Sequence, residues 1–181
     1  MGRAILLAII QPGGLQAAAG ELWSADWAWG LPLIVLTVVL HVLCLGLINQ
    51  RVLRTSGGML QHPHRYTAFV VVTGVTTMLA TGLHGIEAVM WAAAYRLVDA
   101  VPDSRSAMLY SLNAITSYGH TTLVLEPRWQ LMGALEALNG WLLFGLTTAF
   151  LFSVIDKIWL LGVRETSEPA RGAARAATLV R

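Results

Sequence analysis

The stretch LPLIVLTVVLHVLCLGLI, residues 31–48, decides the fold class of this chain. It lies within 24 consecutive residues, between Asp26 and Arg51, that carry no formal charge. A helix needs about 20 such residues to cross the hydrocarbon core of a bilayer. The stretch therefore predicts a first transmembrane helix, over residues 28–50.

Two more runs of the same kind follow along the chain. They hold 21 uncharged residues after Arg65 and 19 after Glu136, and they predict transmembrane helices over residues 66–95 and 130–160. The whole chain of 181 residues is 56% hydrophobic and 12% charged, about half the charged fraction of a soluble domain. We therefore expect an all-α, multi-pass membrane protein that contacts membrane lipids.

The composition argues against several other classes of protein. A single Cys gives no intrachain disulfide framework, and no Cys/His spacing resembles a zinc site. A net charge of +2 is too small for a nucleic-acid-binding surface. No nucleophile and base pair, cofactor motif or cluster of metal ligands stands out. We expect no enzymatic activity and no cofactor.

A fourth uncharged run, residues 106–125, differs in character because it is rich in Ser, Thr, Asn and Gly. Its first half, SAMLYSLNAIT, predicts a helix of about three turns with Asp103 or Ser104 as the N-cap. Its second half, SYGHTTLVLE, has no helical periodicity. Lipid does not accept such backbone unless protein or water surrounds it. The pattern predicts a re-entrant half-helix followed by an extended return strand, over residues 104–122.

The basic residues do not choose between a re-entrant and a spanning segment, because either topology puts eight Lys and Arg on one side and four on the other. In the re-entrant topology, residues 1–27 form an external amphipathic segment and residues 161–181 a basic cytoplasmic tail. A cleaved signal peptide, ending near Ala17 to Ala19, is the alternative for the amino terminus.

The stretch MLYSLNAITSYGHTTLVLEPRWQLMGALEALNGWLLFGLTTAFLFSVI, residues 108–155, resembles the pore module of the bacterial two-transmembrane-type ion-channel family, in the potassium-channel-like superfamily. The resemblance covers residues 100–157. It implies an outer helix, a pore helix, a filter, the loop LEPRW and an inner helix with a hinge glycine. It also implies a homotetramer in the bacterial cytoplasmic membrane, since one chain cannot surround an ion.

The filter departs from the family pattern TVGYGD. In one register Ser117 to His120 lie on GYGD, and in the other Thr116 to His120 lie on TVGYG, which suits the hinge spacing better by one residue. Both registers replace at least one filter glycine, so potassium selectivity is not implied. The expected function is a channel for monovalent cations, K⁺ or Na⁺, and the alternative is a non-conducting scaffold or accessory subunit. The expected filter residues are Thr116, Ser117, Tyr118, Gly119, His120 and Thr121.

The remaining candidate residues lie on the predicted spans. Glu136 and Asn139 share a helix face and are expected to support the filter, while His120 at the pore mouth would make acid inhibitory. Intramembrane His84 and Glu87 suggest a partnered site, in which Arg96, Arg105 or His84 could pair with Glu87. The expected hinge and pore-lining residues are Gly140, Phe144, Thr147, Thr148 and Leu151; close helix packing is the alternative for Gly140.

Overall fold

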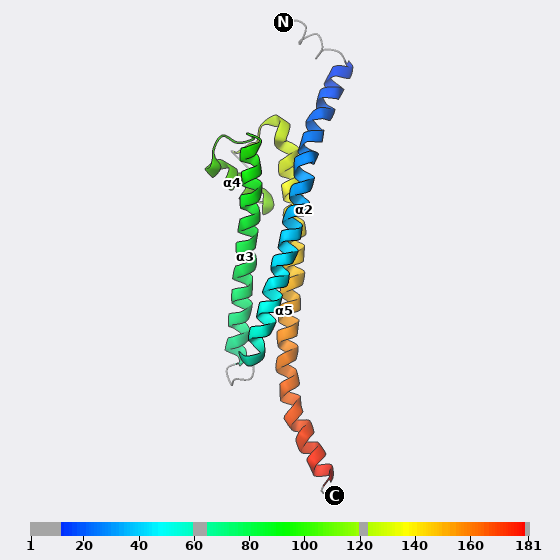
Figure 1. Cartoon of the computed structure of the whole chain (residues 1–181), viewed down its shortest axis with the longest axis vertical. Coiled ribbons are helices and arrows are strands. Elements are labelled where there is room, and N and C mark those ends of the chain that lie inside the picture. The colour runs from blue at the N-terminus through cyan, green and yellow to red at the C-terminus, as the bar shows by residue number, and fades with distance from the viewer. Residues whose placement is uncertain (1–11, 60–64, 120–122, 180–181) are drawn as a thin grey trace. The chain divides into compact units, whose positions relative to one another are not determined.

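The computed structural model describes the backbone of residues 12–59, 65–119 and 123–179, and the side chains of 24–52, 54, 66–119 and 123–157. This part of the chain is all-helical (Figure 1). It contains α2 (Pro12–Met59), α3 (Arg65–Leu97), α4 (Ser104–Ile115), the short 3₁₀ helix η1 (Pro127–Trp129) and α5 (Gln130–Leu179).

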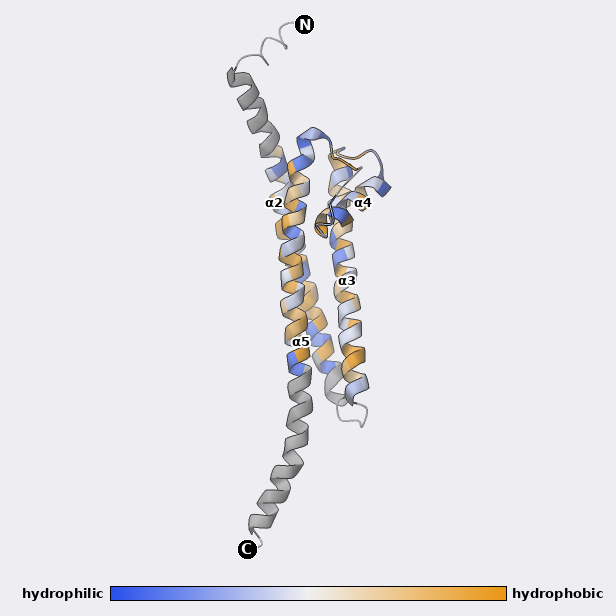
Figure 2. Cartoon of the chain, turned by 180° about the vertical axis from the view of Figure 1, so that it is seen from behind, coloured by the Kyte–Doolittle hydropathy of each residue, from blue (hydrophilic) through white to orange (hydrophobic). Residues whose placement is uncertain are grey.

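Three of these helices are long and apolar enough to span a membrane, over Ser24–Val52, Tyr66–Leu97 and Pro127–Lys157. Apolar residues cover most of the described length of α2, α3 and α5 (Figure 2). Many large ones are exposed, for example Met78 at 68% and Trp141 at 67%. Exposed apolar surface of this extent is typical of helices that face lipid, which agrees with the expected membrane protein.

Two expected boundaries fall inside helices. Helix α2 runs without a break from Pro12 through the boundary expected at residues 27 and 28. Helix α5 continues past residue 161, where the basic tail was expected to begin, and ends at Leu179. The first eleven residues, which include the apolar part of the expected amino-terminal segment, lie outside the described residues.

The chain divides into two compact units, Met1–Leu40 with His84–Leu143, and His41–Leu83 with Phe144–Arg181. The first unit has the larger core, centred on Trp91, Tyr95, Tyr110 and Met132. The rings of Tyr95 and Tyr110 meet edge to face, with centroids 5.2 Å apart, an arrangement worth about 0.5–1.5 kcal/mol beyond burial. In the second unit, smaller clusters form around Leu45 and Val154.

Candidate functional site

The candidate site is built on α4, a helix of the predicted length, for which Asp103, one of the two caps considered, is the N-cap. Asp103 has extended backbone and is the N-cap. Its Oδ1 accepts a hydrogen bond from the Ser106 backbone N–H (2.9 Å), and its Oδ2 accepts one from the Ser106 hydroxyl (2.7 Å). The first bond satisfies a backbone amide that a helix start leaves without a partner.

The same two hydrogen bonds hold the pKa of Asp103 below its ordinary value. The ionised carboxylate therefore stabilises α4 fully above the unfolded pKa, about 3.9, and this stabilisation is lost as the pH falls through the lower folded value. We expect Asp103→Ala to lower the hydrogen-exchange protection of the Ser106 and Ala107 amides at neutral pH. Asn can cap a helix but its side chain does not ionise, so Asp103→Asn should retain the protection of these amides at neutral pH and at pH 3. Equal protection in wild type and Asp103→Ala would contradict this role.

One face of α4 is buried, and its residues recur at helical spacing. The intervals of three and four residues place them in a single stripe. Helix α4 lies beside the carboxyl end of α3 (Figure 1), and the Ser111 hydroxyl of the stripe donates to the Ala88 carbonyl of α3 (2.7 Å). The buried residues are Ala107, Tyr110, Ser111, Ala114 and Ile115.

A fully buried carboxyl group, that of Glu136 of α5, joins α3, α4 and α5 in the first unit. Its Oε2 accepts a hydrogen bond from the Tyr95 hydroxyl of α3 (2.6 Å), and its Oε1 lies in hydrogen-bond contact with Ser111 of α4. Buried carboxylates are costly unless they are hydrogen-bonded in this way. Glu136, expected to support the filter, thus contacts helix α4 ahead of the expected filter residues, through Ser111.

Asn139, expected to act beside Glu136, lies against a different helix. Its Nδ2 donates to the Thr37 hydroxyl oxygen of α2 (2.9 Å), and both side chains are fully buried. Two turns earlier in α5, the Met132 backbone N–H donates to Asp26 of α2 (2.9 Å). No role for Thr37 or Asp26 was predicted, because each partner lies more than 100 residues away along the chain.

Two glycines of α5 allow α4 to approach the α5 backbone. A Cβ on Gly133 would overlap the Tyr110 hydroxyl, and a Cβ on Gly140 would overlap the Ile115 carbonyl. The two glycines are seven residues apart and therefore lie on one face of α5. Gly140, expected as a hinge with close packing as the alternative, is in close contact with α4.

The carboxyl end of α4 is closed by a Schellman motif. The Ser117 N–H donates to the Ala114 carbonyl (2.9 Å) and the Tyr118 N–H to the Asn113 carbonyl (3.0 Å). Ser117 has a φ of 54° and Gly119 a φ of 91°. An extended strand beginning at Ser117 was expected, and this is wrong for Ser117 because the capping turn requires left-handed backbone there.

Of the six expected filter residues, the structure describes the four from Thr116 to Gly119. Thr116 and Ser117 form the turn, and Tyr118 projects outward with 85% of its surface exposed. His120 and Thr121 lie outside the described residues. An open groove of about 310 Å³ adjoins the turn. It is lined by Tyr110, Asn113, Ala114, Ser117 and Gly119 on one side and by Gly133, Ala134 and Ala137 on the other.

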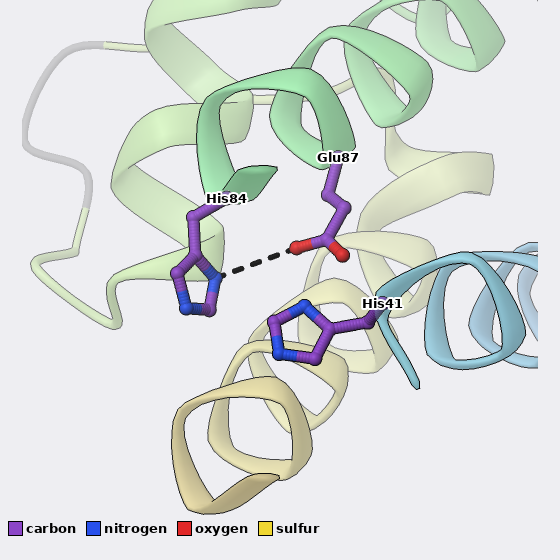
Figure 3. Close-up of side chains that lie close together, drawn as sticks. All are labelled: His41, His84 and Glu87. Carbon is purple, nitrogen blue, oxygen red and sulfur yellow. Dashed lines mark ion pairs between the residues drawn. The ribbon is translucent and has the colours of Figure 1, made fainter. Parts of the chain in front are cut away.

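In α3, Glu87 lies beside His84, one of the three partners considered for it. His84 Nδ1 lies 3.4 Å from Glu87 Oε2 (Figure 3), and the Glu87 side chain is fully buried while that of His84 is 28% exposed. Of the partners considered for Glu87, the structure thus pairs it with His84. The separation of three residues places both side chains on one face of the helix.

The expected pore-lining residues differ in their surroundings. Thr147 is buried, and its hydroxyl lies 2.9 Å from Nε2 of His41. Thr148 is exposed and donates to the Phe144 carbonyl of its own helix (2.9 Å). Phe144 is 62% exposed and Leu151 is half-buried. Thr147 thus contacts another helix, α2, within the second unit.

The comparisons with known proteins add no relative. No protein-family model, curated protein or solved structure matches this chain. The interpretation of the site therefore rests on the chain's own sequence and geometry.

Proposed function

We propose that the chain is a subunit of a membrane channel for monovalent cations, K⁺ or Na⁺, assembled as a homotetramer in a bacterial cytoplasmic membrane. The observation that carries the proposal is the capped half-helix α4, followed by a non-helical polar turn and anchored on α5 by Glu136 and Gly140. A pore needs irregular polar backbone that can replace an ion's hydration shell, held rigidly by regular elements.

The exposed polar surface around this turn supports an oligomer. Thr116 and Ser117 are exposed in the single chain and Asn113 is half-buried, and lipid does not accommodate polar backbone and side chains of this kind. Neighbouring subunits and a water-filled path would surround them. On this proposal, residues 116–121 line the entry, and the partial negative charge at the α4 carboxyl end favours cations.

A non-conducting scaffold with the same fold is the second candidate. The observation that favours it is the turn at Thr116 and Ser117, which uses two backbone carbonyls of α4 for capping. Neither of these carbonyls then points toward an ion. A scaffold and a channel would both form tetramers, but only the channel would conduct ions. The test must therefore measure both the oligomeric state and the ion flux.

Ion flux into liposomes containing the purified full-length chain tests the proposal. We expect tetramers and flux of K⁺ or Na⁺ that exceeds flux of a large organic cation under the same gradient. We expect Gly119→Val, which strains a left-handed position, to change the K⁺ to Na⁺ flux ratio. Leu138→Ala, at an exposed apolar position, is the matched control and should not. Tetramers without flux at acidic and alkaline pH would establish the scaffold instead.

A further inference from the structure

One turn of α5 contacts two helices at consecutive residues. Asn139 donates its hydrogen bond to Thr37 of α2, and Gly140 lies against the Ile115 carbonyl at the carboxyl end of α4. Consecutive residues of a helix point about 100° apart, so one turn can hold different neighbours. Helix α2 and the carboxyl end of α4 therefore both contact this single turn of α5.

The Thr37 hydroxyl has a fixed orientation. It carries one proton, which it donates to the Leu33 carbonyl (2.8 Å) or the Ile34 carbonyl (3.0 Å) of its own helix. Its oxygen is then free to accept from Asn139. Because both side chains are fully buried, water cannot replace the bond when it is broken.

Further contacts place α2 against α5 and against the carboxyl end of α4. Val38, the residue after Thr37, packs in an apolar cluster with Ile115 and Leu143. Asp26 and Gly30 contact α5 at Met132 and Leu135. Asp26, Gly30 and Thr37 are four and seven residues apart, which puts them on one face of α2.

We infer that Thr37 is a positioning residue for the candidate pore entry. Through Asn139 and Gly140, it fixes the carboxyl end of α4 and hence the turn at residues 116–119. The first transmembrane helix, which lies outside the resemblance to known pore modules, thereby becomes part of the site. The pore role of the turn rests on the proposed function, whereas its positioning by Thr37 does not.

The test compares Thr37→Val, which keeps the shape but removes the acceptor, with Thr37→Ser, which keeps the hydroxyl. The readout is the reaction rate of a cysteine placed by Tyr118→Cys with a water-soluble maleimide, in the full chain carrying Cys44→Ser. We expect Thr37→Val to change this rate about three- to tenfold, the equivalent of one lost hydrogen bond. Thr37→Ser should retain the rate. Thr76→Val is the matched control, because Thr76 is equally buried and donates to its own helix at Val72.

The same variants are then assayed for K⁺ and Na⁺ flux. A changed flux ratio in Thr37→Val alone would support positioning of a working pore. A changed maleimide rate without flux in any protein, wild type included, would support the positioning and contradict the proposed function. Equal maleimide rates in Thr37→Val, Thr37→Ser and Thr76→Val would overturn the inference.

A second route covers the case in which Thr37→Val does not fold. Thr37→Ala and Asn139→Ala are measured singly and together by the same maleimide rate. If the two residues act through one bond, the double variant changes the rate no more than the larger single change. If the rate change of the double variant equals the product of the two single rate changes, the residues act independently and the inference is overturned.

Discussion

Glu136→Ala is expected to lower the free energy of unfolding by about 2–5 kcal/mol. The substitution leaves the buried Tyr95 hydroxyl without its acceptor, which costs about 1–3 kcal/mol. It also leaves a cavity where α3, α4 and α5 meet, and cavities of this origin add a comparable loss. Thermal unfolding in detergent, followed by far- and near-ultraviolet circular dichroism, measures the difference.

Glu136→Gln is the matched control and should be close to wild type. The amide oxygen can accept from Tyr95. The amide nitrogen can donate to the Ser111 oxygen, while the single Ser111 proton goes to the Ala88 carbonyl. Glu126→Ala, which removes an exposed ion pair with Arg128, should change stability by less than about 1 kcal/mol. Equal stability of Glu136→Ala and Glu136→Gln would contradict the anchoring role.

The second large effect is expected from Gly140→Ala. The new Cβ would overlap the Ile115 carbonyl, a backbone atom that moves only if the end of α4 moves with it. We expect a loss of about 1–3 kcal/mol, the usual cost of overpacking. We also expect faster maleimide modification of a cysteine at position 118. Unfolding and modification rates are measured on the same protein.

Gly145→Ala provides the control on the same helix. A Cβ at Gly145 meets no atom within 4 Å, so the substitution should gain up to about 1 kcal/mol from helix propensity. If Gly140 were a flexible hinge with no close neighbour, Gly140→Ala would stabilise helix α5 as Gly145→Ala does. Its functional effect would then be on gating. Stabilisation by both substitutions would therefore restore the hinge interpretation.

The helices could be predicted from the sequence because their signals are local. The uncharged runs predicted the three long helices, and Asp103 followed by apolar residues at helical spacing predicted α4 with its cap. His84 could be considered as a partner of Glu87 for the same reason, since the two residues are three apart in one helix, but the choice between His84, Arg96 and Arg105 needed the structure.

The contacts between distant segments could not be predicted in this way. Thr37 stands in an otherwise apolar run, and nothing near it indicates a partner 102 residues away. A glycine within a helix has two explanations, local flexibility and close approach of a neighbour. Gly140 could be assigned to the second only from the position of Ile115. Ser117 appeared extended because its neighbours are polar, whereas its backbone angle follows from the capping turn.

The contact between Ser111 and Glu136 has a consequence for the biosynthesis of the protein. Helix α4 leaves the ribosome before the segment that carries its anchor. When α4 first forms, Ser111 can reach the Ala88 carbonyl of the helix already made, but its contact on α5 lies 25 residues further along the chain. A half-helix of 12 residues is too short to span the bilayer. On the proposed topology, α4 therefore completes its packing only after α5 has been made and brings Glu136 to it.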